Sequence, residues 1–223
     1  RVFADGVVLP TGDPLAQLAR PDGWNRVPVI AGTNHDENKL FQFMNPVYVK
    51  RWLGVVPQVR DPDLYLATAD AQSAMWKATG ADGPAAAMWS TQPNVFVYRF
   101  DWDEEPSLLG IDLGTYLGAA HGFEIPFVFG HWDLGRQGSV IFNDANRPGR
   151  EALAEPMMSY WANFAWKGDP GRGRGGDLPA WNAWDDQPGA HKYLILDTTD
   201  GGGVRMGSEP VTPESVIAAV DAD

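Results

Sequence analysis

The segment VPVIAGTNHDE, residues 27–37, decides the expected fold. Residues 27–33 are apolar, rich in β-branched side chains and bounded by turn-forming residues, which is typical of a strand buried on both faces of a mostly parallel sheet. The segment then ends in two acidic residues, Asp36 and Glu37. Active sites of open α/β sheets lie beyond the carboxyl ends of the strands, so the segment predicts an α/β fold with a carboxylate at its functional edge.

Further strands and helices alternate along the chain. Residues 94–100 and 193–197 have the β-branched and aromatic composition of strands. Residues 63–78 and 84–89 are rich in Ala, Leu and Met, which favour helices, and residues 150–166 carry apolar side chains at helical spacing. The alternation predicts a mostly parallel central sheet flanked by helices.

Glycine and proline predict where these elements end. The sequence Gly-Ala-Asp-Gly at 80–83 predicts a break between the first two helices. Pro156 predicts that the third helix is kinked early or begins nearer Glu155, and Gly168 predicts its end. Residues 101–118 and 171–176 are expected to form loops, the second of them mobile.

The whole chain, residues 1–223, is expected to belong to one domain without an internal boundary. The few visible strands barely reach the number that an independent open sheet needs, so the domain is expected to be incomplete without a segment upstream of residue 1. Alone, the chain would leave sheet edges and apolar faces uncovered, and we expect poor solubility.

Composition excludes several functional classes. A net charge of -12 opposes binding to nucleic acid or anionic lipid. No apolar run approaches the roughly 20 residues of a membrane span, so a soluble protein is expected, in a compartment that the sequence leaves open. The absence of cysteine excludes disulfides and thiolate chemistry, and His35, His131 and His191 lack ligand spacing, so neither a metal nor another cofactor is expected.

Glu37 and His121 are the candidate catalytic pair. Glu37 follows the strand at 27–33, and His121 lies in a Gly/Ala-rich loop, residues 118–122, that permits tight turns. A carboxylate that orients an imidazole is useful where the imidazole accepts a proton from a nucleophilic serine. No serine of this chain lies in a Gly-x-Ser-x-Gly nucleophile elbow. In α/β-hydrolases the serine precedes the acid and the histidine, so it is expected upstream.

Several segments, in order along the chain, resemble the type-B carboxylesterase (cholinesterase-like) family of α/β-hydrolases. Residues 27–37 resemble its strand ending in Gly-Thr-Asn-x-Asp-Glu, and residues 118–130 resemble its His-Gly-x-Glu-x-x-x-Val-Phe-Gly segment. Residues 3–10, 160–170 and 179–184 resemble its Asp-Gly-x-x-Leu-Pro, Asn-Phe-Ala-x-x-Gly-Asp-Pro and Pro-x-Trp-Pro-x-Tyr stretches. The chain is therefore expected to be the C-terminal portion of an α/β-hydrolase fold.

The resemblance implies hydrolysis of small carboxylic esters by a Ser/His/Glu triad. His121 would be the base and Glu37 the acid, while the N-terminal half of the same enzyme would supply the serine and the oxyanion hole. It also implies that Leu40 and Phe41 line the substrate gorge, with Phe123 as a further candidate. An apolar gorge favours uncharged acyl and aryl esters.

Two departures from the family pattern affect loops rather than catalytic groups. Asn38 replaces the glycine after the acid and Asn182 replaces a proline. Asn38 is expected to alter the loop that carries Glu37 and hence the shape of the pocket, although the tolerance of asparagine for left-handed backbone limits this effect. The modest separation between Glu37 and His121 and the lack of cysteine resemble the bacterial branch of the family. Choline specificity is therefore not expected.

Alternatives remain open at this level. Asp36 is expected to cap the local turn, although it is one position from Glu37 and could be the triad acid instead. Glu124 is expected to brace the histidine loop or cap the next helix. The chain could also belong to a noncatalytic cholinesterase-like binding or adhesion protein, or be an inert fragment. Retention of both Glu37 and His121 favours the enzyme.

Overall fold

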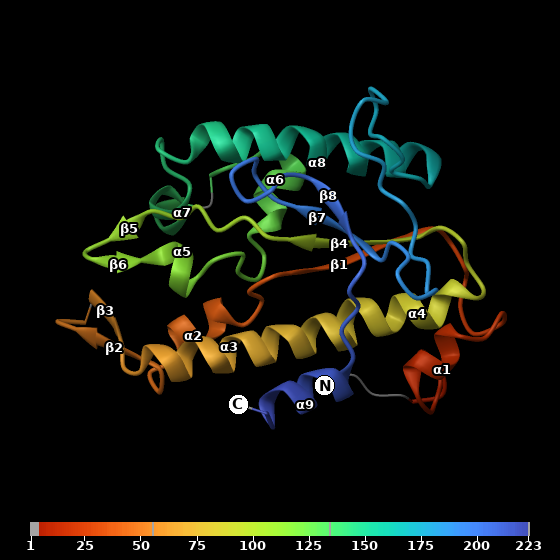
Figure 1. Ribbon diagram of the computed structural model, residues 1–223, viewed down its shortest axis with the longest axis horizontal. Coiled ribbons are helices and arrows are strands. Elements are labelled where there is room, and N and C mark those ends of the chain that lie inside the picture. The colour runs from red at the N-terminus through yellow and green to blue at the C-terminus, as the bar shows by residue number, and fades with distance from the viewer. Residues whose placement is uncertain (1–4, 55, 134, 223) are drawn as a thin grey trace.

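A four-stranded sheet forms the centre of the structure, a computed structural model that describes residues 5–54, 56–133 and 135–222 (Figure 1). The strand order is β1 (Val29–Asn34), β4 (Val95–Phe100), β7 (Tyr193–Leu196), β8 (Arg205–Gly207). The β1–β4 and β4–β7 pairs are parallel and the β7–β8 pair is antiparallel. The predicted mostly parallel sheet is confirmed, and the three predicted strands correspond to β1, β4 and β7.

The edge position of β1 changes one expectation. Among the described residues β1 pairs only with β4, and its first four residues are half-buried, whereas Thr33 and Asn34 are buried. The prediction that this strand is buried on both faces is therefore wrong for most of its length. No described strand lies beside the outer edge of β1.

Alternating side chains of the two inner strands build separate cores on the two faces of the sheet. Phe96 and Phe100 of β4 join one apolar cluster, and Val95 and Val97 join another. The strand β7 divides in the same way, with Leu194 and Leu196 on one side and Tyr193 and Ile195 on the other. This period of two follows from the pleat of a strand, and it explains why both strands consist of apolar residues.

Helices cover both faces of the sheet (Figure 1). On one face lie α6 (Glu124–Phe129) and the long α8 (Arg147–Lys167), which pack against each other. Along the other lie α3 (Pro62–Lys77) and α4 (Gly83–Trp89), and α9 (Pro213–Val220) packs on α3. No helix in the described part of the chain is long and apolar enough to cross a membrane.

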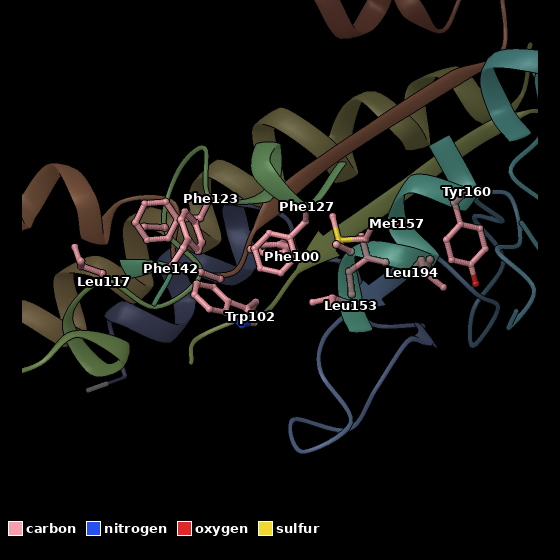
Figure 2. Close-up of a cluster of buried hydrophobic side chains, with 14 of the residues drawn as sticks. Phe100, Trp102, Leu117, Phe123, Phe127, Phe142, Leu153, Met157, Tyr160 and Leu194 are labelled. Carbon is pink, nitrogen blue, oxygen red and sulfur yellow. The ribbon is translucent and has the colours of Figure 1, made fainter. Parts of the chain in front are cut away.

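The core under α6 and α8 is rich in aromatic rings (Figure 2). Phe127 of α6 contacts Phe100 and Trp102 with ring centroids 4.9 and 5.2 Å apart, and Phe142 contacts Trp102 at 5.5 Å. A fully buried side chain of this size contributes about 1.5–3 kcal/mol by leaving water, and close aromatic pairs add to that. This cluster anchors α6, the helix that follows His121.

The predicted break at residues 80–83 is wrong, because a π-helical turn joins α3 to α4. The turn, η1, covers Ala78–Asp82, and α4 begins at Gly83 without an intervening loop. Asp82 lies buried in this turn, where it pairs with Lys77 and accepts a hydrogen bond from the backbone nitrogen of Val211 at 2.7 Å. A wider turn thus accommodates the glycines inside a continuous helical segment.

The helix α8 begins earlier than Pro156 suggests. It starts at Arg147, continues through Pro156 and ends at Lys167, so the predicted start near Glu155 is wrong. A proline lacks only one backbone donor, and packing of the helix on the core outweighs that loss. The predicted end is confirmed, since Gly168 adopts a φ of 71° that favours glycine.

The predicted loops contain local structure. Within residues 101–118 lie a hairpin, β5 (Ser107–Leu108) and β6 (Ile111–Asp112), and the short helix α5 (Leu113–Tyr116). The segment 171–176, predicted to be mobile, is tied down by hydrogen bonds of 2.8 Å from the backbone of Arg174 to Ser159 Oγ and from that of Trp181 to Gly171. The remaining elements are α1 (Pro14–Leu18), α2 (Lys39–Met44), the hairpin β2 (Val49–Trp52) and β3 (Val56–Val59), and α7 (Gly135–Ile141).

Gly32 is required where β1 passes the ring of Tyr98. The two residues are partners in the β1–β4 register, and a Cβ on Gly32 would lie 2.2 Å from Tyr98 Cδ1. We therefore expect Gly32→Ala to lower the free energy of unfolding by about 1–3 kcal/mol, the usual cost of overpacking. Chemical denaturation measures this loss. Gly80→Ala is the control, because its added methyl would make an ordinary 3.4 Å contact; an equal loss in both variants would contradict the argument.

Candidate active site

Glu37 and His121 form a close hydrogen-bonded pair. Glu37 follows β1 directly and His121 precedes α6, and their side chains meet with His121 Nδ1 2.6 Å from Glu37 Oε2. That distance is typical of a charge-assisted hydrogen bond. The two residues that the sequence singled out are therefore in contact, and the alternative of Asp36 as the partner of His121 is not what the structure shows.

The carboxylate of Glu37 is fixed from both sides. Its Oε1 atom accepts hydrogen bonds from the backbone nitrogen of Asn34 at 2.9 Å and from Thr33 Oγ1 at 3.1 Å, while Oε2 is occupied by His121. The residue is 5% exposed. A buried carboxylate with both oxygens engaged has little freedom to rotate, so it holds the imidazole in one orientation.

The opposite side of the imidazole is open. Among the residues that the structure describes, none forms a hydrogen bond with His121 Nε2, and the side chain is 47% exposed. When Nδ1 carries the proton that is donated to Glu37, Nε2 is left as the acceptor. The pair thus presents a proton-accepting nitrogen at the surface of the described chain.

Asp36 joins the acid loop to the histidine loop. Its backbone nitrogen donates to Ala119 O at 3.1 Å, and its Oδ2 accepts from the backbone nitrogen of Ala119, also at 3.1 Å. Its Oδ1 faces His35 Nδ1 at 3.1 Å and Lys39 Nζ at 3.0 Å. Asp36 therefore sets the position of the histidine loop relative to Glu37 and does more than cap its own turn.

Gly118 leaves the space that this contact needs. Its φ is 51°, and a Cβ at this position would lie 2.3 Å from Asp36 Oδ2. Gly122, on the other side of His121, has a φ of 82°. The expectation that small residues allow tight turns around His121 is confirmed, and at Gly118 the constraint is both conformational and steric.

The charges around Asp36 shift two pKa values. Burial alone would raise the pKa of Asp36, but the hydrogen bond from His35 and the positive charges of His35 and Lys39 outweigh it and hold the pKa below its ordinary value. The hydrogen bond to Asp36 raises the pKa of His35. Asp36 is therefore ionised in the folded protein, as an anchor of this kind must be.

Glu124 braces the histidine loop through Asn34. The side-chain nitrogen of Asn34 lies 2.5 Å from Glu124 Oε2 and 2.7 Å from the backbone oxygen of Ala120. Burial raises the pKa of Glu124. Of the two roles expected for Glu124, the contacts support bracing.

Two further polar contacts hold the helices around the pair. Tyr65 Oη lies 2.8 Å from the backbone oxygens of both Lys39 and Tyr116, so its proton can be donated to either. The backbone nitrogen of Asn38 donates to Ser73 Oγ at 3.1 Å. Asn38 has a φ of -89° and precedes α2 in a right-handed conformation, so the tolerance of asparagine for left-handed backbone is not needed here.

The candidate pocket residues differ in their surroundings. Phe41 is 42% exposed and its ring lies 5.3 Å from the His121 imidazole, centroid to centroid. Leu40 is half-buried against the core. Phe123 is 7% exposed and packs on Phe142, as Figure 2 shows, which gives a pocket role less support than Phe41 has. All three assignments stay predictions.

Among the described residues, no group of three or more His, Cys, Asp or Glu side chains has an arrangement that could hold a metal ion. The polar groups nearest the pair are engaged with one another: Asp36 with Lys39 and His35, and Glu124 with Asn34.

Residues 65–209 match the model of the carboxylesterase family, which is more than half of the chain. The chain belongs to this family. It is 28% identical over 185 residues to para-nitrobenzyl esterase of Bacillus subtilis (strain 168), covering 77% of this chain and 34% of that protein. It is 34% identical over 115 residues to carboxylesterase 5A of Mus musculus, covering 52% and 19%.

Several solved structures share the fold of this chain. A PNB esterase structure aligns with a TM-score of 0.63 and 22% identity over 96% of this chain and 42% of that one. EstA of Aspergillus niger aligns with a TM-score of 0.62 and 22% identity over 98% and 43%. The chain thus spans less than half the length of each, and it has the fold of part of an α/β-hydrolase. Since its relatives include animal and bacterial proteins, placement in the bacterial branch stays a prediction.

Several members of this carboxylesterase site were missed by sequence reasoning. Thr33 and Asn34 lie inside the recognised strand segment but their contacts with Glu37 depend on how the chain turns after β1. Trp76, whose indole lies 5.2 Å from the His121 ring, and Tyr65 come from α3, far along the chain from both catalytic candidates. No local pattern marks them. Of the resembling segment 3–10, residues 3 and 4 lie outside the described residues.

The ionised state of Asp36 predicts how this carboxylesterase chain responds to acid. Since its pKa is lower in the folded state than in the unfolded state, Asp36 stabilises the fold above its ordinary pKa of 3.8, and this contribution disappears as the pH falls through the folded-state pKa. Asp36→Asn should therefore have a lower free energy of unfolding than the wild type at neutral pH. On acidification, its free energy of unfolding should fall by less than that of the wild type. Denaturation curves from neutral pH to below pH 3.8 test this.

The exposed Asp70 provides a matched control, because it forms no ion pair within the described part of the chain. Asp70→Asn should keep the acid response of the wild type. A wild-type acid response in Asp36→Asn would show that Asp36 is not held in its ionised form.

Proposed function

We propose that this chain is part of a serine esterase and that it supplies the acid and the base of a Ser/His/Glu triad. The observation that carries the proposal is the 2.6 Å contact between Glu37 Oε2 and His121 Nδ1, with Nε2 directed away from the carboxylate and unpaired among the described residues. A carboxylate on one ring nitrogen and an open second nitrogen is the arrangement that activates a hydroxyl nucleophile.

The acylation step uses both nitrogens of His121. Nε2 accepts the proton of the serine hydroxyl as its oxygen forms a bond to the ester carbonyl carbon. The Glu37 carboxylate, held by Thr33 and Asn34, stabilises the imidazolium that results. The bond from the carbonyl carbon to the alcohol oxygen then breaks, and His121 returns the proton to that oxygen. The products of this step are the free alcohol and an acyl-serine.

Deacylation repeats the sequence with water. His121 takes a proton from a water molecule that attacks the acyl carbon, and it then gives the proton to the serine oxygen as the carboxylic acid leaves. Glu37 does not need to change its protonation state in either step. No metal or other cofactor is required.

The serine and the oxyanion-hole donors are proposed to come from the N-terminal half of the same enzyme. The chain has no Gly-x-Ser-x-Gly sequence, and it spans 34% of the Bacillus subtilis relative. The strand β1, which carries Glu37 at its end, has an outer edge that no described strand covers. Such an edge suits a further parallel strand, and a loop after that strand would lie at the same side of the sheet as Glu37.

The proposed substrates are small uncharged carboxylic esters. The rings of Phe41 and Trp76 lie beside the His121 ring, and relatives of the chain bear the names para-nitrobenzyl esterase and cocaine esterase. Leu40 and Phe41 are proposed to line the pocket, with Phe123 as a weaker candidate.

Substitutions at His121 and Glu37 test the two proposed roles, the base and the acid that orients it. In the full-length enzyme, His121→Ala should lower kcat by roughly 10⁴-fold or more, because no other group can take the serine proton, and Glu37→Gln by roughly 10⁴-fold, because an amide neither fixes the tautomer nor stabilises the imidazolium. Steady-state hydrolysis of p-nitrophenyl acetate gives both values. His191→Ala, which changes an exposed histidine, should have wild-type turnover. Near-normal turnover in His121→Ala would refute the assignment.

A fluorophosphonate probe decides between an esterase and a noncatalytic binding protein. The purified protein is treated with the probe, and intact mass is measured under denaturing conditions. Label on a longer chain or on a companion polypeptide supports the proposal. An unlabelled species of 24.4 kDa as the sole product would favour the binding or inert alternatives.

A further inference from the structure

Two short hairpins project from the same end of the molecule, beyond α2 and α5 (Figure 1). One is β2–β3, which follows the loop that carries Glu37, and the other is β5–β6, which lies in the segment before His121. A groove of about 520 Å³ lies between them. Apolar side chains of both hairpins line this groove, among them Val56, Val59 and Ile111.

The tips of both hairpins expose apolar side chains. Leu53 is 76% exposed and Leu109 is 70% exposed, and Trp52, next to the first tip, is 60% exposed. The two tip leucines have φ values of 50° and 52°, and each precedes a glycine that also has a positive φ. Asparagine or glycine is favoured in such backbone, and leucine is not. These leucines gain little within the described chain, so an apolar contact outside it would explain their presence.

The first hairpin is basic. Residues 48–60 contain Lys50, Arg51 and Arg60 and no acidic residue, in a chain whose net charge is -12. Lys50 and Arg51 are exposed, and neither forms an ion pair within the part of the chain that the structure describes. Two cations are therefore free to meet negative charge on a partner.

The second hairpin is acidic. Residues 101–112, which contain the hairpin and lead into it, include five acidic residues and no basic one. Of these, Asp103 and Asp112 are exposed. One continuous surface thus carries a basic hairpin and an acidic hairpin, with an apolar groove between them.

We infer that this surface is a two-fold interface between two copies of the chain, in which the basic hairpin of each copy contacts the acidic hairpin of the other. A two-fold axis along the groove brings each hairpin opposite its complement, so every charge is matched twice. The exposed tips then cover the apolar groove of the partner.

A second copy fits this surface better than two other occupants do. An anionic lipid surface would attract the basic hairpin and repel the acidic one, and the net charge of the chain opposes it. The N-terminal half is proposed to continue the sheet beside β1, whereas the hairpins project beyond the carboxyl end of that strand (Figure 1).

Sedimentation equilibrium of the full-length enzyme tests the interface. The wild type should have twice the mass of one chain at micromolar concentration, and its dimer Kd should rise with salt because the hairpin contacts are charged. Arg51→Glu should raise the Kd by about 10-fold or more, because each dimer contains the reversed charge twice. Arg20→Glu is the control: Arg20 is exposed and pairs with Asp22 outside the hairpins, so the Kd should not change.

Substitutions at the tips separate the interface from the fold. Leu53→Asn and Leu109→Asn should each raise the dimer Kd by about 10-fold or more, because a covered leucine is lost twice per dimer. Since asparagine tolerates positive φ, denaturation below the Kd should give each variant an unfolding midpoint equal to or above that of the wild type. Trp166→Asn removes a side chain of α8 that is 86% exposed, and it should leave the Kd unchanged.

The outcomes do not depend on the proposed esterase function. A wild type that stays monomeric at every attainable concentration would overturn the inference, and so would a wild-type Kd in Arg51→Glu and in both leucine variants. A monomeric wild type that binds phosphatidylserine vesicles, with binding lost in Arg51→Glu, would show a lipid contact instead. Labelling with the fluorophosphonate probe should be equal in the wild type and Arg51→Glu, because the hairpin lies outside the catalytic pair.

Discussion

The two-way pairing between Asp36 and Ala119 is the constraint on which the site depends. Parallel pairing of β1 with β4 aligns Asn34 with Phe100, but the chain then makes a long excursion through β5, β6 and α5 before it reaches His121. Two hydrogen bonds of 3.1 Å between Asp36 and Ala119, one donated by each residue, hold the end of this segment against the loop that carries Glu37. Because the partner is the residue adjacent to Glu37, a small shift of this contact would move His121 relative to its carboxylate.

Polar groups near the pair are buried and engaged, while the reactive nitrogen is left open. Thr33, Asn34 and Glu37 are each 5% exposed or less, and every one of them is hydrogen-bonded within this network. A network of that kind is rigid because each unsatisfied member would be costly in a low-dielectric interior. Among the described residues of this network, Asn34 Oδ1 is buried without a partner, and Nε2 of His121, which is open, is where a proton can be exchanged. The aromatic side chains of Phe41 and Trp76 lie beside the His121 ring and add no competing charge.

Short contiguous patterns predicted three of the four strands of the central sheet, the helices α3, α4 and α8, and the central pair. Residues adjacent in the sequence are enough to predict the strands β1, β4 and β7 and the end of α8. Glu37 and His121 lie in segments that resemble a known family. Prediction failed where distant packing overrides local preference. Glycines at 80–83 suggested a break, yet Asp82 is buried with Lys77 and the helix continues through a π turn. Trp76 reaches the site only because α3 packs beside α2, which no local signal reports.

The central claim is that Glu37 holds His121 by its Nδ1 proton and leaves Nε2 as the base. Nuclear magnetic resonance of the protein with isotope-labelled histidine tests this most directly, at a pH where the imidazole is neutral. The account predicts a strongly downfield proton on Nδ1 of His121, an unprotonated Nε2, and a marked upfield shift of that proton in Glu37→Gln. A neutral His121 with its proton on Nε2, or an Nδ1 proton resonance that ignores the substitution at Glu37, would contradict it.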